Sequence, residues 1–390
     1  MMRAAPNPSA RVSLGELSMT LTELPPSIPI RGLTFGHRLA LMIGRFWRRI
    51  VRRVFVWNPV TVAFWVTHGQ IISSAMATLS RLGVFDRLRD GPKSAGELAK
   101  AVDANEDALT RLLTAVSALG LLKRQKDDRF ALNAVARQFC SDSPQPLGPW
   151  SELMLHGTAM LDKMPDAVRA GQPLMKYVHD DTCWSVMANL PGATELHDRA
   201  MSAWSQMEVD QIAHAYDFSK AKTVVDVGGG RGALLCAFLR AAPHLRGTVY
   251  DRENTRDDAV ERFRREGVAD RAEHVSGNFF ESVPQGADFY SIKHVLHDWD
   301  DDHVRIVLTS IRNAIPAHGR LLIIEGCVGH ELLPGTAVRE VWNLVQWVGT
   351  WGKSRTINDF ENLLQSTGYR LDSITITPTV DALILEAVPV

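Results

Sequence analysis

The pattern of hydrophobic and polar positions changes near Phe218. Before it, apolar residues recur mostly every three or four positions, which is the period of amphipathic helices. After it, short strand-like segments alternate with segments of helical period. This order predicts an α/β fold in which an open, mostly parallel sheet carries helices on both faces.

Seven strands and at least four helices are expected after Phe218. The strands are expected at residues 223–227, 247–250, 273–276, 289–292, 320–324, 373–377 and 382–386. The helices are expected at residues 233–241, 257–265, 303–314 and 357–367. Because only a short turn separates the last two strands, one of them is expected to be antiparallel.

The segment from residue 66 to 142 predicts three helices and a hairpin. The helices are expected at residues 71–88, 94–102 and 106–122, with a further one at 133–139. Ser94, followed three residues later by Glu97, is typical of a capping box at a helix start. Residues 122–132 predict two short strands around a charged turn. The combination is typical of a winged-helix module.

Four regions follow from these patterns. They are a basic extension (1–60), an all-helical winged-helix domain (61–145), a helical linker and substrate cap (146–217) and a catalytic domain (218–390). Apolar candidates for the lining of the cap are Trp184, Met187, Leu196 and Met201.

Charge separates the extension from the rest of the chain. Residues 1–60 contain nine Arg and two Glu, a net charge of +7, whereas the remainder carries 34 basic and 42 acidic residues, or −8. Residues 33–56 predict a basic amphipathic helix. We favour an arm that packs on the body or on a partner subunit. The second interpretation is peripheral contact with an anionic membrane surface.

Composition excludes several classes of protein. With 45% hydrophobic and 22% charged residues among 390, wholesale disorder is excluded. The four Cys form no CxxC pair and do not cluster with His, so neither a disulfide framework nor a metal site is expected. No signal peptide is indicated, and the longest apolar window, 54–66, is shorter than the ~20 residues that span a bilayer. We expect a cytoplasmic protein.

A glycine-rich loop joins the first expected strand to a helix. The sequence DVGGGRG (226–232) lets the backbone approach a ligand closely at a helix start. It also satisfies a dinucleotide fingerprint, so a nicotinamide enzyme is a competing hypothesis. Asp226 before the turn and Gly232 after it favour S-adenosylmethionine, because an acid there can reach an ammonium but repels a pyrophosphate.

Further candidate ligand-binding residues lie at the ends of the next strands. Asp251 is placed to accept both ribose hydroxyls. Phe279 is placed to stack on adenine, and Asn278 to accept from its amino group. For each of these residues taken alone, packing or turn formation is the default interpretation.

The segment KHVLHDWDDD (293–302) follows the fourth strand and contains the candidate base. His297 is expected at the carboxyl edge of the sheet, where an imidazole can remove a proton from a phenol or alcohol near neutral pH. Glu325, at the end of the next strand, is expected to orient it. Asp298 is a third candidate catalytic residue, whereas His294 is expected to be buried or structural.

In these motifs the chain resembles the S-adenosylmethionine-dependent O-methyltransferases that include plant caffeate-type, hydroxyindole and bacterial antibiotic-tailoring enzymes. The resemblance covers residue 71 to the carboxyl terminus. Its motifs are DVGGGRG, GNFFESVP (277–284), KHVLHDWDDD, IIEG (323–326) and GKSRT (352–356), in the order typical of that family.

The resemblance implies a winged-helix dimerisation domain, a Rossmann-like class I methyltransferase domain and a homodimer. The acceptor is expected to be a hydroxylated apolar small molecule, an aromatic natural product or an isoprenoid, and fold and family do not choose between them. Candidate aromatic residues for its pocket are Trp150, Trp184, Trp342, Trp347 and Trp351.

The resemblance assigns Gly228, Gly229, Gly230 and Gly232 to the methionine moiety, Asp251 to the ribose, Asn278 and Phe279 to adenine, and Lys293 to the vicinity of the cofactor. Arg252 is a further candidate cofactor residue, although Arg252-Glu253 replaces the Leu-Pro that is common in the family. His297 becomes the proton acceptor. Ser354 departs from the family, because many members have a second histidine-orienting Glu there.

That departure keeps one alternative open, an enzyme of this fold with non-methylating chemistry such as hydroxylation or pericyclic rearrangement. A DNA-binding winged helix is the other alternative. Its third helix has Arg111 as the only basic residue, which is a poor match for phosphate contacts, so no nucleic-acid partner is expected.

Overall fold

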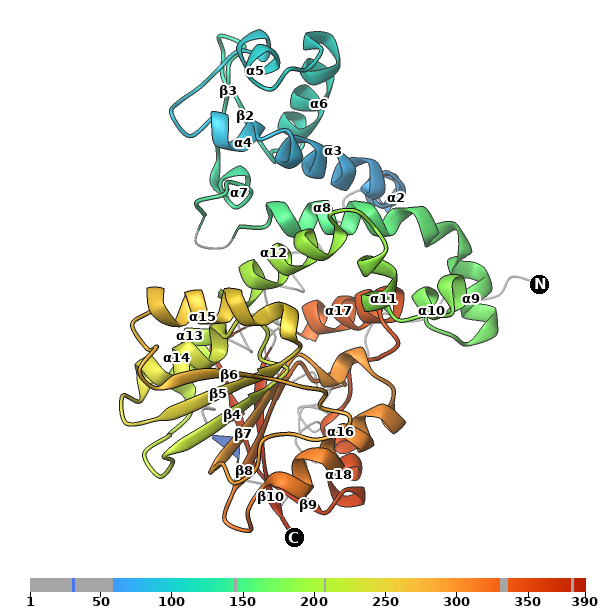
Figure 1. Ribbon diagram of the computed structural model, residues 1–390. Coiled ribbons are helices and arrows are strands. Elements are labelled where there is room, and N and C mark those ends of the chain that lie inside the picture. The colour runs from blue at the N-terminus through green and yellow to red at the C-terminus, as the bar shows by residue number, and fades with distance from the viewer. Residues whose placement is uncertain (1–29, 32–58, 144–145, 207, 330–335, 380–381) are drawn as a thin grey trace, which may run out of the picture.

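The computed structural model describes residues 30–31, 59–143, 146–206, 208–329, 336–379 and 382–390 (Figure 1). The predicted basic helix at 33–56 lies outside the described residues. Within them, no helix is long and apolar enough to span a membrane.

The amino-terminal region forms a small helical unit with its own core. Its elements are α2 (Pro59–Thr67), α3 (Gly69–Arg81), α4 (Val84–Arg87), α5 (Ala95–Ala101), α6 (Glu106–Ala118), β2 (Lys123–Arg124), β3 (Phe130–Ala131) and α7 (Ala134–Arg137). Leu79, Phe85 and Leu113 are buried in the core. The antiparallel pair β2–β3 confirms the predicted hairpin. An all-helical domain was therefore the wrong description.

Two local predictions in this unit had different outcomes. Ser94 caps α5 and exchanges reciprocal hydrogen bonds with Glu97, which confirms the capping box. The single helix expected at 71–88 is wrong, because Gly83 adopts a left-handed φ of 72° and separates α3 from α4. Apolar periodicity continues across Gly83, which is why the pattern alone predicted one helix.

A second helical layer lies between this unit and the sheet (Figure 1). It comprises α8 (Gly148–Gly157), η2 (Thr158–Lys163), α9 (Met164–Ala170), α10 (Leu174–His179), α11 (Cys183–Ala188) and α12 (Ala193–Gln206), and it is followed by α13 (Val209–Ala215), which lies against the sheet. Within this layer α8 packs against both α3 and α12. The layer therefore connects the amino-terminal unit to the cap over the sheet.

An eight-stranded sheet organises the carboxyl-terminal half in the order β1-β9-β10-β8-β7-β4-β5-β6. Its strands are β1 (Ile30–Arg31), β4 (Thr223–Val227), β5 (Arg246–Asp251), β6 (Ala272–Ser276), β7 (Phe289–Lys293), β8 (Arg320–Glu325), β9 (Tyr369–Ile376) and β10 (Leu383–Pro389). Only β10 runs antiparallel to its neighbours, as expected for one of the last two strands. β1 adds a parallel strand beside β9 that the sequence pattern did not predict.

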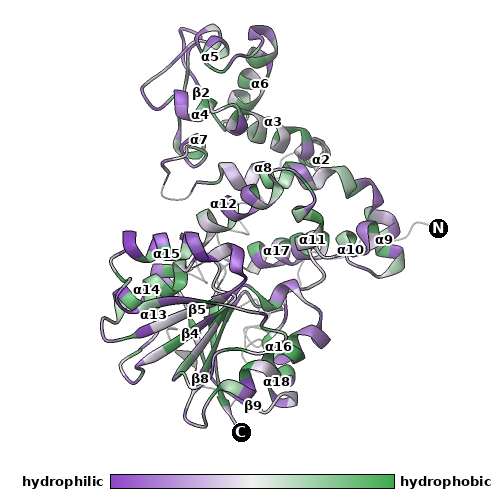
Figure 2. Ribbon diagram, viewed as in Figure 1, coloured by the Kyte–Doolittle hydropathy of each residue, from purple (hydrophilic) through white to green (hydrophobic). Residues whose placement is uncertain are grey.

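Helices cover both faces of the sheet. The helices α13, α14 (Ala233–Ala241) and α15 (Arg256–Arg265) pack on one face, and α16 (Asp301–Ala314) and α18 (Ile357–Ser366) on the other. Figure 2 shows hydrophobic residues concentrated in central strands such as β8 and hydrophilic ones on outer helices such as α15. This two-sided burial explains why the central strands are continuously apolar.

One helix of functional interest was missed. α17 (Thr336–Gly349) lies under the cap, beside α10 and α11 (Figure 1). It contributes Trp342, Val345 and Gln346 to the cavity described below. From this segment, only Trp342 and Trp347 were predicted, as aromatic candidates for the pocket lining.

Candidate active site

A cavity of about 1680 Å³ lies between the carboxyl ends of the strands and the helical cap. Ligands of open α/β sheets bind at this edge. The lining includes predicted cofactor residues from the ends of β4 to β7 and side chains of α8, α11, α12 and α17. Cofactor and acceptor regions therefore form one continuous space.

The glycine loop after β4 lets the backbone turn tightly at the start of α14. Gly228, Gly230 and Gly232 have φ values of 69°, 54° and 75°, which favour glycine. A Cβ on Gly229 would lie 2.6 Å from Oδ2 of Asp226. The loop therefore covers the Asp226 carboxyl with only backbone in between.

Asp226 fits a cationic ligand group. Oδ1 accepts a hydrogen bond from the Ser291 hydroxyl at 2.7 Å, whereas Oδ2 is buried without a partner. Burial raises the pKa of Asp226 to about 7. A buried carboxyl oxygen with no donor, beneath a loop made of glycine backbone, suits the ammonium group of an amino-acid moiety, which is part of S-adenosylmethionine.

Asp251 lies where the ribose prediction requires it. Oδ2 accepts from the backbone N–H of Gly230 at 2.7 Å, and Oδ1 from that of Arg252 at 2.6 Å. These bonds fix the carboxylate at the cavity wall, and each oxygen retains a further acceptor position. The Arg252 guanidinium lies 5.3 Å from the ring centre of Trp184, so it connects the ribose side to α11.

Two predicted cofactor residues make other contacts in the structure. The Asn278 side chain serves its own turn, since it accepts from the Phe280 backbone at 3.1 Å and donates to Glu281 at 2.9 Å. Gly232 is outside the cavity lining, and a Cβ there would lie 2.6 Å from Phe263 Cε1. Gly232 therefore allows α14 and α15 to pack closely. Asn278 and Phe279 still line the cavity.

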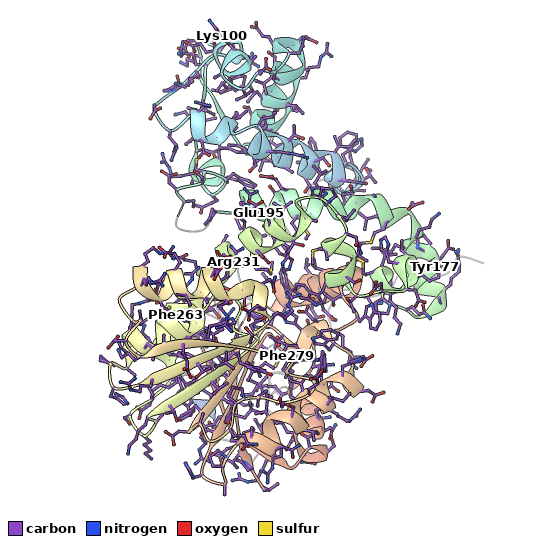
Figure 3. All side chains as sticks on the ribbon, viewed as in Figure 1. Lys100, Tyr177, Glu195, Arg231, Phe263 and Phe279 are labelled. Carbon is purple, nitrogen blue, oxygen red and sulfur yellow. The ribbon has the colours of Figure 1, made fainter. Side chains whose placement is uncertain are left out.

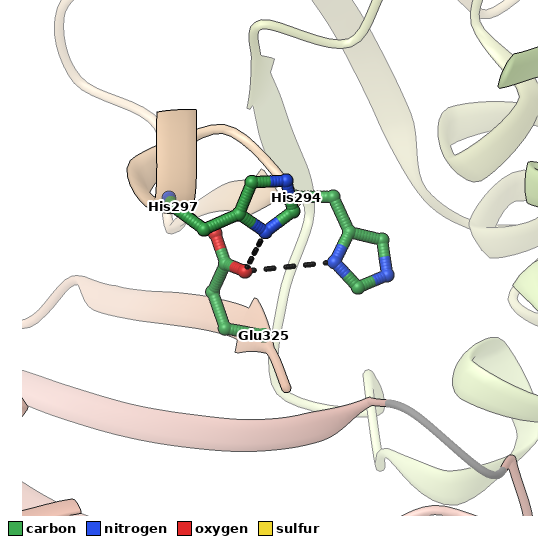
Figure 4. Close-up of side chains that lie close together, drawn as sticks. All are labelled: His294, His297 and Glu325. Atoms are coloured by element: carbon green, nitrogen blue, oxygen red, sulfur yellow. Dashed lines mark hydrogen bonds and ion pairs between the residues drawn. The ribbon is translucent and has the colours of Figure 1, made fainter. Parts of the chain in front are cut away.

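His297 and Glu325 form a buried pair at the other end of the predicted site (Figure 4). His297 Nδ1 lies 2.7 Å from Glu325 Oε2. Glu325 Oε1 accepts from the backbone N–H groups of residues 295, 296 and 297 at 3.0 to 3.4 Å. These donors fix the carboxylate, which in turn orients the imidazole ring with Nε2 toward the cavity.

The charges around His297 favour its protonated form. Burial lowers its pKa, but Glu325 and Asp298 outweigh burial, so the pKa is raised overall. Burial also raises the pKa of the Glu325 carboxyl, yet His297 and His294 hold it well below its usual range. Asp298 has a pKa raised to about 6 by burial, and its Oδ1 lies 3.7 Å from His297 Nε2.

A second buried ion-pair network extends this one toward the cap. Glu208, between α12 and α13, lies 2.7 Å from Lys293 Nζ and 3.0 Å from His294 Nε2. His294 is buried, as expected, and its Nδ1 lies 3.5 Å from Glu325. Burial lowers the His294 pKa, but Glu208 raises it to about 10, and the Glu208 pKa falls to about 2 despite burial. Glu208 lies in none of the sequence motifs, so sequence reasoning missed it.

Ser354 does not join the His297 network. Its backbone N–H donates to Asn343 Oδ1 at 3.0 Å. The side chain facing His297 Nε2 comes instead from α17, where the Gln346 amide lies 3.1 Å away. Sequence reasoning missed Gln346 because nothing in the spacing of α17 relates it to the KHVLHDWDDD segment.

The acceptor part of the cavity is largely apolar. Trp184, Met187, Leu196 and Met201 line it, as predicted. Of the other tryptophans considered, Trp150 and Trp342 line it and stack with ring centres 5.1 Å apart, whereas Trp347 and Trp351 do not line it. Figure 3 places Arg231 at the junction of α12 and the glycine loop, where it pairs with Asp198 at 3.1 Å, and Phe279 at the sheet edge.

Comparison with known proteins decides the family. Residues 161–370 match the O-methyltransferase domain, and residues 65–142 match the O-methyltransferase dimerisation domain. The chain belongs to the O-methyltransferase family. It is an S-adenosylmethionine-dependent methyltransferase, and its dimerisation domain supports a homodimer that acts on a small molecule. The alternatives of a nicotinamide enzyme and a DNA-binding regulator are thereby set aside.

Relatives in the family include natural-product enzymes. The chain is 37% identical over 316 residues to the mitomycin biosynthesis 6-O-methyltransferase of Streptomyces lavendulae, covering 79% of this chain and 88% of that one. It is 30% identical to the phenazine O-methyltransferase PhzM of Lysobacter antibioticus, with 84% and 94% covered.

Solved structures agree with this assignment. The mitomycin 7-O-methyltransferase MmcR superimposes with a TM-score of 0.78 at 34% identity, over 85% of this chain and 98% of that chain. NcsB1 from neocarzinostatin biosynthesis, solved with S-adenosylmethionine and 2-hydroxy-5-methyl naphthoic acid, gives 0.71 at 28%, over 82% and 96%. The class I methyltransferase fold with a helical dimerisation domain is confirmed.

Proposed function

We propose that the chain methylates a hydroxyl group of an aromatic, largely apolar small molecule, with His297 as the proton acceptor. The observation that carries this proposal is His297 in the cavity lining, with its Nδ1 held by Glu325 and its Nε2 on the other side of the ring. Relatives are named for O-methylation in mitomycin biosynthesis, and NcsB1 was solved with 2-hydroxy-5-methyl naphthoic acid, which is a bicyclic aromatic compound. Stacking side chains such as Trp150 and Trp342 suit that class of acceptor.

Bound S-adenosylmethionine supplies an electrophilic methyl group on a sulfonium. Asp226 would hold its ammonium group, Asp251 its ribose hydroxyls and Phe279 its adenine ring. The chain's own contribution to the reaction is alignment, because ordered juxtaposition of reacting groups can supply ~7–11 kcal/mol.

We assign proton transfer to Nε2 of His297. Glu325 holds a proton on Nδ1 of His297, so the lone pair of the neutral ring is on Nε2, which faces the cavity. From there it can take the hydroxyl proton of an acceptor as the oxygen attacks. General-base catalysis of this kind contributes ~100- to 10,000-fold.

The acceptor can be identified by isotope transfer. The purified protein is incubated with S-adenosylmethionine labelled in its methyl group and an extract of the source organism, and the labelled product is isolated. We expect a methyl ether on an aromatic ring. Label on carbon or nitrogen, or consumption of a substrate without release of S-adenosylhomocysteine, would contradict the proposal.

The basic extension, residues 1–60, needs a separate proposal. We infer that residues 1–60 pack on the dimer, and membrane contact stays the second hypothesis for them. Deleting these residues distinguishes the two, because a variant that remains dimeric but loses binding to anionic liposomes would favour the membrane.

A further inference from the structure

Gln346 is a buried polar residue that none of the sequence motifs includes. It lies on α17, 5% exposed, against the Nε2 side of His297. Its amide group is 3.0 Å from Trp342 Nε1, 3.1 Å from His297 Nε2 and 3.2 Å from Asp298 Oδ1. The Thr350 hydroxyl, 3.3 Å from the amide, can donate or accept and fits either orientation, so the other three neighbours determine it.

Trp342 determines which end of the amide faces His297. An indole N–H can only donate, so the atom of Gln346 that faces Trp342 is the oxygen. The same oxygen faces His297 Nε2, and the amide nitrogen donates to Asp298. Rotating the amide would place two donors against each other at Trp342 and two oxygens against each other at Asp298.

This orientation requires a proton on His297 Nε2. The Nδ1–H already donates to Glu325, so a ring that donates from both nitrogens is an imidazolium. Without the second proton, the Nε2 lone pair would face the Gln346 oxygen at 3.1 Å. The charged and titratable groups that face His297 are Glu325 at the end of β8, Asp298 in η4 (Leu296–Asp298) and His294 in the loop before it.

More distant charges belong to the same cluster. Glu208 and Lys293 lie behind His294, and His197 of α12 acts on Asp298. None of them approaches the Nε2 face as Gln346 does. The net raised pKa of His297 agrees with a ring that donates from both nitrogens.

We propose that Gln346 is a positioning residue that occupies the place of the acceptor hydroxyl and stabilises His297 as an imidazolium until the acceptor displaces it. The proposal rests on the proposed function, in which His297 is the base. A hydroxyl can donate to Nε2, whereas the Gln346 oxygen cannot, so only the acceptor is compatible with the neutral ring. When His297 becomes neutral, its Nε2 proton passes to solvent, and Nε2 then takes the proton of the bound hydroxyl.

Two variants separate this role from packing. Gln346→Met keeps an unbranched side chain of similar length but removes the acceptor. Trp342→Phe keeps an aromatic ring but removes the donor that fixes the amide, so Gln346 can rotate and donate to a neutral His297. The titration of His297 is followed by NMR of the ligand-free full-length protein, with His297→Ala used to assign its signal.

We expect the His297 titration midpoint to fall by about one to two pH units in Gln346→Met, the shift that corresponds to one lost hydrogen bond to a charged group. Trp342→Phe should lower it in the same direction by less. The acid limb of kcat/KM, which reports the free enzyme, should move to lower pH by the same amount in each variant.

An unchanged His297 midpoint in Gln346→Met would overturn the proposal, and a lower melting temperature in that variant would then indicate packing alone. The outcome is independent of the proposed function, because the NMR titration needs no turnover. If His297→Ala retained full kcat, the proposed function would fail while the titration still decided the role of Gln346.

Discussion

The cofactor side of the cavity is formed by loops at strand ends, whereas the acceptor side is formed by side chains on helices. On the cofactor side, backbone turns and carboxylates follow consecutive strands, as with Asp226, Gly229 and Asp251. On the acceptor side, isolated side chains from α8, α11, α12 and α17 converge from distant parts of the chain. A shared cofactor can be held by fixed backbone geometry, whereas acceptors differ between enzymes and are recognised by exchangeable side chains on helices.

His297 lies where the two sides meet. Its Nδ1 contacts Glu325 at the end of β8, and its Nε2 faces Gln346 of α17, the helix under the cap. The comparison therefore predicts that substitutions on the Nδ1 face affect turnover, those under the glycine loop affect cofactor affinity, and those at the cap affect both only weakly.

The largest effect is expected for Glu325→Gln. One oxygen of Glu325 accepts hydrogen bonds from three backbone N–H groups, and the other accepts one from His297 Nδ1. The glutamine side chain has only one oxygen, so in the variant its NH₂ group would face one of these donors. We expect kcat to fall by ~100-fold or more. The matched control is Glu386→Gln, a buried carboxylate in β10 that does not line the cavity. Equal loss of kcat in both variants would show a general effect on folding.

Asp226→Asn is expected to weaken cofactor affinity by ~10- to 100-fold near pH 8, since a hydrogen bond to a charged group contributes ~1.5–3 kcal/mol. The Asp226 pKa of about 7 sets the pH dependence. The carboxyl is neutral below pH 7 and ionised above it, so affinity for a cationic ammonium rises as pH increases from 6 to 8.

Calorimetry with S-adenosylhomocysteine measures this effect. The rise in affinity with pH should be present in the native protein and absent in Asp226→Asn. Asp288→Asn, which changes a carboxylate at the start of β7 rather than at its cavity end, is the control and should keep the rise. A pH-dependent affinity that survives in Asp226→Asn would contradict the assignment.

The smallest effect is expected at the cap. Arg231 pairs with Asp198 of α12 at 3.1 Å and with Asp258 of α15 at 3.0 Å, and all three side chains are partly exposed. Pairs of this kind contribute ~0.2–1 kcal/mol, so Asp198→Asn should raise KM by no more than ~5-fold. Asp258→Asn removes the other partner of the same Arg without touching the cap. If it raised KM as much, the cap contact would have no special role.

The same comparison explains what could be predicted from the sequence. Asp226, Asp251 and Glu325 lie at or next to the carboxyl ends of strands, and His297 follows β7 within four residues. Because the carboxyl ends of parallel strands meet at one edge, strand order predicts that these residues lie close together. The antiparallel last strand was likewise predictable from its short turn. The family resemblance added the dimerisation domain and the cofactor.

Other features depended on contacts that local pattern does not encode. Gly83 breaks a helix that periodicity predicts as continuous, and Asn278 forms hydrogen bonds within its own turn rather than presenting a free amide. Glu208 reaches the site because the cap folds over the sheet, and Gln346 because α17 packs under the cap beside α10. The family resemblance predicted a departure at Ser354, but the side chain that faces His297 Nε2 comes from α17.

The central claim is that His297 is the proton acceptor of methyl transfer. The most direct measurement compares kcat for the identified acceptor and the dissociation constant of S-adenosylhomocysteine in native protein and His297→Ala. The account predicts that kcat falls by ~100- to 10,000-fold while the dissociation constant changes by less than about 3-fold. Equal losses in both quantities, or an unchanged kcat, would contradict it.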